Sequence, residues 1–436
     1  MARLPRRALS PVPAVPAAGT EGPAGTAAEP WKRWTGALVL AWLGLWVAQF
    51  APLQVLLPQL TARLDTGSDW LGVVRDFGVV AGAGGLVSAL ALPLVGRALD
   101  RTPTDATHRG WYVGSVALCA LGLVVLGVQS TLLGAALAWS LTLLGLCAAG
   151  TVLTVAVTRR VPPGQRGTVS TGVAAANALG IVLGTALAAS AAQDARAGGL
   201  LLAGAVVAAC VPYAVGRPPR PLAPALALAV DPGVAEPVVE GSGRGSSRPL
   251  LAGLGVRGLL VLGNALGTTL LLFFFTYRLR MADAEDFLVQ VVLVYVVATV
   301  LTAAVCGPLS DRWRARRRFL VASVALQGGA ALALALVPDR ATVLLAGVVL
   351  GVGWGAFMAV DQAVVATVAS RTERPAAAVA VLGIAASLPQ NLGPLAAALI
   401  VTGTGGFGPL FVAAAAVVGT AGLFVAALPV ERVTDR

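Results

Sequence analysis

The sequence predicts an all-α integral membrane protein with twelve transmembrane helices, arranged as two six-helix bundles related by a pseudo-twofold axis. Hydrophobic residues make up 57% of the 436 residues and charged residues only 12%, whereas a soluble domain carries about 25% charged residues. At about 20 residues per crossing, a chain of this length can form roughly twelve spans with their loops. The third observation is a short basic turn that occurs once in each half of the chain.

The basic turn lies between two apolar runs in both copies. Residues 96–101 read Gly-Arg-Ala-Leu-Asp-Arg, and residues 307–312 read Gly-Pro-Leu-Ser-Asp-Arg. The two copies are 211 residues apart (307 − 96). A fixed offset of about half the chain indicates an internal duplication, and this is why we expect two similar bundles.

The first half is expected to be a short tail followed by six spans. Residues 1–33 are rich in Pro, Ala and Gly and lack the apolar core of a signal peptide, so we expect a disordered cytoplasmic tail. The N-terminal bundle is expected over residues 34–215. Its apolar runs predict spans at about 34–57, 71–95, 111–128, 132–157, 169–191 and 198–215.

The second half begins after a linker. Residues 216–249 are rich in Pro, Gly and Ser and contain no run long enough to cross a bilayer, so we expect a cytoplasmic linker. The C-terminal bundle is expected over residues 250–428 and a cytoplasmic tail over 429–436. The predicted spans are about 258–277, 287–306, 319–337, 341–368, 376–401 and 409–428.

The basic residues predict the orientation. With both termini in the cytoplasm, six of the 31 Lys and Arg residues fall outside and the other 25 fall on the cytoplasmic side, as the positive-inside rule requires. We therefore expect a multi-pass protein of the cytoplasmic membrane whose partners are the lipid bilayer and a small-molecule substrate. The net charge of +11 is explained by topology signals, so no nucleic-acid partner is expected, and the protein is expected to be a monomer.

Few residues could support catalysis or metal binding. The four cysteines stand singly inside apolar runs, and His108 is the only histidine. The spacing of the cysteines and the histidine fits neither a metal site nor a disulfide framework. No Walker or dinucleotide motif is present. We expect no enzyme activity and no cofactor, with a proton or cation gradient as the energy source.

The repeated turn resembles the signature loop of the major facilitator superfamily, which joins the second and third spans of each half. The second copy is the fuller match, because basic residues follow its aspartate; the first lacks this second basic cluster. The resemblance implies a cytoplasmic latch motif formed by Gly96, Asp100, Arg101, Gly307, Asp311, Arg312 and Arg316.

The resemblance also implies partners for the two aspartates. Asp100 would face the start of span 11 and Asp311 the start of span 5, where a helix N-terminus attracts a carboxylate. Arg160 and Arg371 would be their companions at the ends of spans 4 and 10. The alternative is that the basic residues of these loops act only as topology signals, although acidic residues contribute little to topology.

Asp361 is the clearest charged residue inside an expected span. A central aspartate costs roughly 2.5–3.5 kcal/mol on insertion scales, which suggests a function. It could exchange a coupling proton or bind a substrate hydroxyl; alternatively, it pairs with Arg371, Arg160 or another loop arginine. Arg75 and Asp76, near the outer end of span 2, are interpreted as interfacial rather than as a coupling pair.

Polar and aromatic side chains at suitable depths are candidates for a substrate cavity. Amides suit hydroxylated substrates because each offers a donor and an acceptor, although buried amides more often join helices. Trp46 and Trp139 could also stack on a sugar or a flat drug. The predicted cavity residues are Gln49, Gln54, Asn177, Asn264, Gln290, Trp354, Gln390 and Asn391.

The segments 351–363 and 382–394 resemble an actinobacterial branch of facilitators related to sugar and glycoside symporters. The favoured function is therefore secondary active transport of a small organic solute, as proton-coupled uptake of a sugar- or glycoside-like compound. One alternative is efflux of a drug or hydrophobic metabolite. It is disfavoured because span 4 lacks the arginine, and span 5 the Gly-Pro motif, of proton-coupled drug antiporters. Further alternatives are a passive uniporter and a non-transporting membrane sensor.

Overall fold

In the part of the chain that the structure describes, twelve helical spans are long and apolar enough to cross a membrane. The computed structural model describes residues 24–64, 67, 69–100, 105–191, 194–217, 219, 248–313, 316–370 and 375–428, and within these ranges it contains no strand. Lipid offers no hydrogen-bond partner, so an apolar chain of this kind satisfies its backbone by forming helices. The predicted fold class is confirmed.

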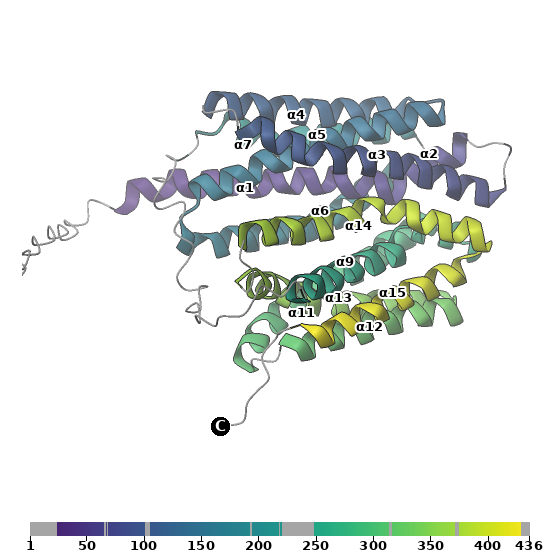
Figure 1. The fold of residues 1–436 in the computed structure, drawn as a ribbon. Helices are drawn as coiled ribbons and strands as arrows, with labels where there is room; N and C mark the ends of the chain where they lie inside the picture. The colour runs from purple at the N-terminus through teal and green to yellow at the C-terminus, as the bar shows by residue number, and fades with distance from the viewer. Residues whose placement is uncertain are drawn as a thin grey trace, which may run out of the picture.

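The first half contains six spans (Figure 1). The first is α1 (Ala24–Ala51), which continues through a π-helical turn, η1 (Pro52–Leu56), into α2 (Leu57–Leu64). Pro52 starts this turn because proline cannot donate the backbone hydrogen bond of a regular helix. The other five spans are α3 (Trp70–Asp100), α4 (Asp105–Gly127), α5 (Leu132–Arg160), α6 (Pro163–Ser190) and α7 (Ala195–Val215).

The second half repeats the arrangement. Its first span is again interrupted, because α9 (Arg248–Thr268) is followed by the short α10 (Leu271–Phe273) and a π-helical turn, η2 (Phe274–Arg278). The other five spans are α11 (Ala284–Trp313), α12 (Arg316–Leu336), α13 (Arg340–Ser370), α14 (Pro375–Thr404) and α15 (Phe407–Ala427).

Several helices extend beyond the predicted spans. The first helix starts at Ala24 rather than near residue 34, and the seventh span starts at Arg248 rather than near residue 258. Hydropathy detects the stretch in the bilayer core, whereas a helix can continue into the headgroup region. Arg257, which precedes the predicted seventh span, therefore lies inside α9. Residues 1–23, 220–247 and 429–436, in the predicted tails and linker, lie outside the described residues.

The contacts between helices follow a pseudo-twofold pattern. In the first half α1 packs on α6 and α7, α5 on α3 and α4, and α4 on α7. The same pairs occur in the second half. There the counterparts of α1, α3, α4, α5, α6 and α7 are, in this order, α9, α11, α12, α13, α14 and α15. The two most extensive contacts between the halves, α3 with α14 and α6 with α11, also exchange under this correspondence. The predicted internal duplication therefore has a structural counterpart.

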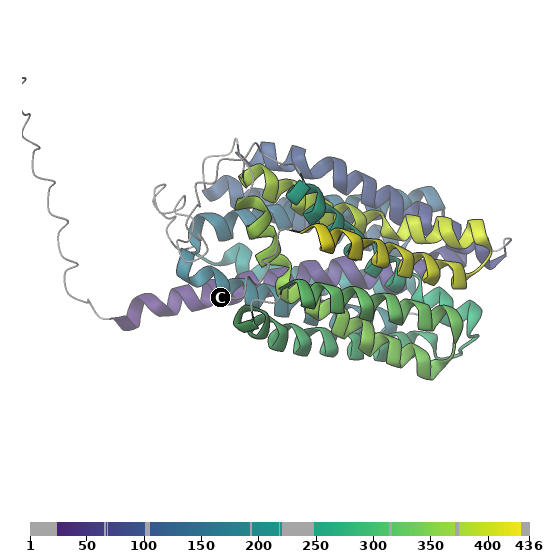
Figure 2. The same ribbon diagram turned by 60° about the horizontal axis from the view of Figure 1, so that its bottom comes forward.

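Both basic turns lie at one end of the molecule. Because α3 is the second span and α11 the eighth, both helices finish at the end where α1 begins, at the left of Figure 1. We call this the basic-turn end. The view in Figure 2 confirms that the described chain starts and finishes at this same end. The opposite end, which holds Trp70 and Phe407, is called the closed end below.

The halves meet closely toward the closed end, along a glycine seam on α3. A side chain on Gly78 or Gly85 would overlap α14, and a Cβ on Gly82 would lie 2.9 Å from Leu395. In lipid, helices associate by such close packing of small residues. The contacting pairs are Gly78 with Ala398, Gly82 with Leu395 and Gly85 with Asn391.

The same two helix faces separate toward the basic-turn end. Further along α3, this face continues to Gly96, where an added Cβ would meet no atom of a described residue within 4 Å. On α14, Ala398 is 2% exposed, whereas Ile384, on the same helix face, is 48% exposed. Leu388 and Val381 on this face are exposed as well. The helices therefore diverge toward this end, and apolar side chains of α14 are exposed on the face that continues from the seam.

The hydrophobic core divides in the same way. One continuous cluster of buried side chains joins the first half to the closed-end portion of the second half. A separate cluster, around Val256, Phe357 and Val425, fills the basic-turn end of the second half and contains no described residue of the first. The two bundles are thus joined at one end and separate at the other.

Candidate functional site

A buried ion pair lies inside the second bundle. Nη2 of Arg257 on α9 is 3.1 Å from Oδ2 of Asp361 on α13, and the two side chains are 16% and 6% exposed. A cavity of about 10 Å³ beside them is bordered by Gly253, Phe357 and Leu382, roughly the space that one water needs. The arginine neutralises the charge of the aspartate in a region where an unpaired charge would be costly.

The ion pair identifies one partner of Asp361. Of the predicted partners, Arg160 instead donates a hydrogen bond to the carbonyl oxygen of Pro219 at the start of the linker, and Arg371 lies outside the described residues. The partner Arg257 was missed because an arginine near the end of an apolar run looks like a loop residue. The sequence does contain a signal for it, because the apolar run already begins at Leu250, shortly before Arg257. Arg257 therefore lies within the helix, which begins at Arg248.

Two of the predicted amides join helices. Thr185 on α6 donates its hydroxyl to Oε1 of Gln54 at 2.7 Å, and Nδ2 of Asn264 on α9 donates to the hydroxyl of Tyr295 on α11 at 3.1 Å. In this state these amides hold helices together, which is the common role of amides in membrane bundles.

The remaining predicted residues are dispersed along the spans. Gln49 is buried and Gln290 is exposed. None of the predicted amides lines the small cavity beside the ion pair or a second, larger cavity at the closed end. Asn391 contributes its backbone carbonyl to the seam with Gly85. The partly buried ones are Asn177, Trp354, Gln390 and Asn391.

Aromatic rings form a ladder along the first span. Trp42, Trp46 and Phe50 stack in turn, with centroids 5.9 Å apart at each step. The indole nitrogens of Trp42 and Trp46 are buried and lack a hydrogen-bond partner among the described residues. A buried donor without a partner costs about 1–3 kcal/mol, so these two N–H groups would gain from an acceptor on a bound solute or water. Trp139, by contrast, is fully buried against Gly84.

The latch residues are described only in part. The backbone places Asp100 at the last residue of α3 and Asp311 in the last turn of α11; their side chains, and all of Arg101, lie outside the description. Gly307, like Gly96, has no described neighbour within 4 Å of an added Cβ. The side chain of Arg312 is exposed and that of Arg316 is partly buried. The predicted contacts of both aspartates remain predictions.

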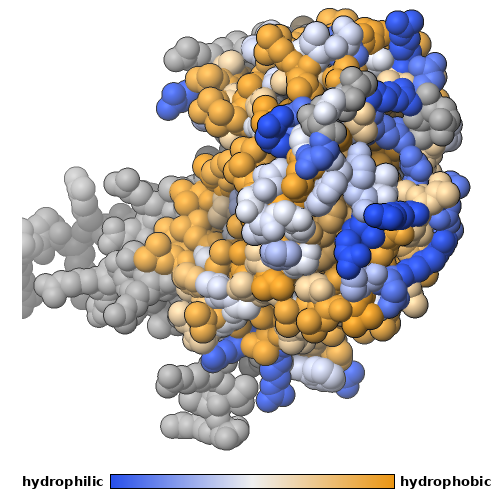
Figure 3. All heavy atoms as spheres, turned by 90° about the vertical axis from the view of Figure 1, so that its right-hand side faces the viewer, coloured by the Kyte–Doolittle hydropathy of each residue, from blue (hydrophilic) through white to orange (hydrophobic). Residues whose placement is uncertain are grey.

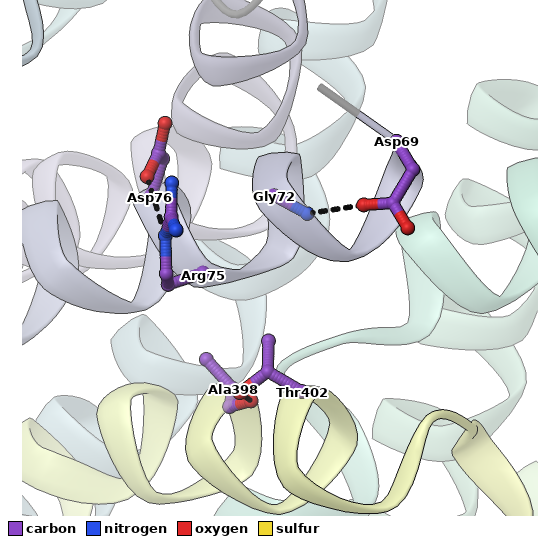
Figure 4. A network of polar contacts seen from close by, with 6 residues as sticks. All are labelled: Asp69, Gly72, Arg75, Asp76, Ala398 and Thr402. Carbon is purple, nitrogen blue, oxygen red and sulfur yellow. Dashed lines mark hydrogen bonds and ion pairs between the residues drawn. The ribbon is translucent and has the colours of Figure 1, made fainter.

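Another pair of charges lies near the closed end of α3. Nε of Arg75 is 3.2 Å from Oδ1 of Asp76, and the arginine side chain is 62% exposed. Figure 4 shows this pair on α3, with Ala398 and Thr402 on the adjacent α14. The exposure of Arg75 agrees with an interfacial location, whereas Asp76 itself is buried.

Polar and aromatic contacts across the halves secure the closed end. Nε2 of Gln59, at the end of the first span, donates to Oε1 of Glu285 at the start of α11 at 3.1 Å. The ring of Trp70 from α3 stacks on Phe407 of α15 at 5.2 Å. Residues from the two bundles therefore meet directly at this end. Sequence reasoning missed these contacts because the partners are more than 200 residues apart.

Two pseudo-symmetric six-helix bundles that are joined at one end and separate at the other are the architecture of a twelve-helix membrane transporter. The description of the matching family model is "Major Facilitator Superfamily", and it covers residues 258–436. None of the curated proteins compared with the chain matches it in sequence.

Solved structures of transporters have the same fold. The human organic anion transporter MFSD10 (TETRAN) is 16% identical, with a TM-score of 0.61 over 91% of this chain and 99% of that one. The nucleoside transporter NupG is 12% identical, with a TM-score of 0.64 over 91% and 99%. A bacterial homologue of the human lysosomal transporter Spinster, in an inward-facing and unoccupied conformation, is 14% identical, with a TM-score of 0.63 over 93% and 95%.

The chain therefore shares the fold of these solved transporters over most of its length, and residues 258–436 match the model of the Major Facilitator Superfamily. The predicted resemblance is confirmed at this level. The closer resemblance to actinobacterial sugar symporters remains a prediction.

Proposed function

We propose that this protein is a secondary transporter that moves a small organic solute by alternating access, with the basic-turn end facing the cytoplasm. The observation that carries the proposal is the divergence of α3 and α14, from close contact at Gly85 to an open face at Gly96. Because the halves are related by a pseudo-twofold axis, rocking one bundle against the other would close this end and open the other. The orientation rests on the positive-inside rule.

The favoured cargo is a small polar solute such as a saccharide or glycoside, moved together with a proton. Trp42 and Trp46 supply unpaired donors beside an aromatic surface, a combination that suits a hydroxylated ring. One proton moving across 100 mV is worth about 2.3 kcal/mol, or roughly fiftyfold accumulation. Coupling requires a group that exchanges a proton within the membrane, and Asp361 with its partner Arg257 is the best placed pair.

Reconstitution into liposomes tests this proposal. Purified protein is given an imposed pH gradient and a panel of radiolabelled sugars, glycosides, nucleosides and organic anions. We expect accumulation of one polar class above its external concentration, and loss of that accumulation when an ionophore removes the gradient. Equilibration without accumulation would show a passive uniporter, and no uptake of any compound by folded protein would contradict the proposal.

Efflux of a hydrophobic compound is the second candidate function. It is favoured by the exposed apolar face of α14 formed by Val381, Ile384 and Leu388. In that case, inside-out vesicles would accumulate a hydrophobic dye when acidified inside, and sugars would not compete. In the uptake model, these same apolar residues instead form the surface that packs against α3 when the basic-turn end closes.

A further inference from the structure

A second cavity, of about 500 Å³, lies at the closed end and contains none of the residues proposed above to bind or couple the cargo. It is bordered by the end of the seventh span, the end of α12 and the turn between α14 and α15, together with Trp70 from the other half. Figure 3 looks onto this end of the molecule, where hydrophilic residues lie among hydrophobic ones. A volume of this size is typical of a small-molecule site.

One part of the cavity wall is aromatic. Trp70 stacks on Phe407 with an interplanar angle of 22°, and its ring centroid lies 6.1 Å from that of Tyr277. All three residues border the cavity. Aromatic walls favour a flat, apolar ligand, which can pack against the rings face to face or edge on.

Another part of the wall is positively charged. Arg278 and Arg280 border the cavity, are exposed, and form no ion pair or side-chain hydrogen bond with any described residue. Their lack of partners contrasts with three aspartates of this end, each of which is engaged. Asp69 accepts from the backbone N–H of Gly72 at 3.1 Å (Figure 4), Asp283 pairs with Arg340 at 2.9 Å, and Asp339 accepts from the backbone N–H of Thr342 at 2.8 Å.

The backbone holds Arg280 in an unusual conformation. Its φ of 52° makes it the only non-glycine residue with positive φ among the described residues. Across the cavity, Gly405 has a φ of 74°. A non-glycine residue in this region is strained, and such strain is concentrated at binding sites. The conformation keeps a second guanidinium at the cavity beside that of Arg278.

We propose that this cavity binds an organic anion with an aromatic body. The arginines would bind a carboxylate, for which the planar guanidinium is well suited, and the rings would pack on the aromatic part. Trp70 belongs to the first bundle and the other lining residues to the second. A bound anion therefore bridges the halves and stabilises the state in which this end is closed.

Binding of 2-naphthoate to the purified full-length chain tests the proposal. The protein is held in phosphatidylcholine nanodiscs and titrated by calorimetry. We expect saturable binding that weakens about tenfold or more in Arg278→Gln/Arg280→Gln and in Trp70→Leu. Arg196→Gln is the matched control, because Arg196 is an exposed arginine at the same end that does not border the cavity. This variant should bind 2-naphthoate with the same affinity as the unmodified chain.

Two further measurements test the role of the carboxylate and the competition from lipid headgroups. The uncharged analogue 2-naphthalenemethanol should bind at least tenfold more weakly, because it cannot use the arginines. Equal binding of the alcohol, or unchanged binding in the double variant, would overturn the proposal. Nanodiscs with phosphatidylglycerol test whether a lipid headgroup occupies the site: retained 2-naphthoate binding supports the aromatic anion, whereas its complete loss would assign the arginines to lipid and overturn it.

Discussion

Arg257 and Asp361 form an ion pair of 3.1 Å that connects α9 with α13 inside the second bundle. The position 211 residues before Asp361 is Gly150 on α5, and there the indole of Trp42 lies 3.7 Å from the place of a Cβ. The duplicated halves thus differ here: one has an ion pair where the other has an aromatic ring over a glycine. A charge retained in one copy alone is a reason to look for a function beyond packing.

Asp361→Asn should lower the free energy of unfolding by about 3 kcal/mol, because it leaves the largely buried guanidinium of Arg257 without its carboxylate. The double variant Asp361→Asn/Arg257→Gln should recover most of that loss, since no unpaired charge remains. Thermal unfolding in detergent measures both. If Asp361 couples transport to protons, the stable double variant still fails to accumulate solute against its gradient. Uphill accumulation by the double variant would limit the pair to a structural role.

Gly85 and Gly96 provide a matched pair of substitutions on one face of α3. Gly85→Val should destabilise the state described here by about 1–3 kcal/mol, because the new side chain would overlap the backbone of α14 at Asn391. Gly96→Val should leave this state unchanged, because its surroundings are open. It should nevertheless slow transport strongly, since α14 would approach Gly96 when the basic-turn end closes. Normal transport by a stable Gly96→Val protein would argue against closure along this face.

The hydrogen bond from Gln59 to Glu285 is expected to hold the closed end shut. Gln59→Leu removes this hydrogen bond between the halves, which is worth about 1 kcal/mol. The equilibrium between the two conformations should therefore shift about fivefold toward the state in which this end is open. Opening of this end is measured by the alkylation rate of a cysteine introduced at Trp70 in a background without native cysteines. We expect Gln59→Leu to make this alkylation faster. Gln59→Glu should open the end further, because two carboxylates would then face each other. An alkylation rate equal in all three proteins would exclude this role.

Arg280 offers a test of backbone strain that does not depend on ligand binding. Glycine adopts positive φ without the steric penalty, so Arg280→Gly should raise the free energy of unfolding by up to about 1 kcal/mol. Arg280→Gln keeps the Cβ and should leave stability near that of the unmodified chain. The comparison uses thermal unfolding of the ligand-free proteins. A glycine variant less stable than the glutamine variant would show that the conformation is not strained.

The sequence was sufficient to predict the architecture, because the signals for it are distributed along the whole chain. Twelve apolar runs give twelve spans, and the repeated Gly96 and Gly307 predict the pairing of the bundles. Helix ends were less predictable, since hydropathy does not record how far a helix continues beyond the bilayer core. That error placed Arg257 just before the seventh span and concealed it as a partner of Asp361.

The site was less predictable than the fold, because its contacts join residues far apart in sequence. Gln59 and Glu285 are separated by 226 residues, and neither has a local pattern that indicates the other. Amides at suitable depth could be listed from the sequence, but only the fold reveals that Gln54 and Asn264 are bonded to neighbouring helices. Substrate contacts depend on which side chains turn toward the other bundle, and helical periodicity alone does not decide this.

The opposite movement of the two ends tests the central claim most directly. Spin labels at Ala106 and Arg317 report the separation of the halves at the basic-turn end, and labels at Arg196 and Ala341 report it at the closed end; all four side chains are exposed. Pulsed electron resonance would be recorded in liposomes with and without a transported solute and a pH gradient. Alternating access predicts that the first distance shortens while the second lengthens. Two distances that stay constant, or that change in the same direction, would contradict the account.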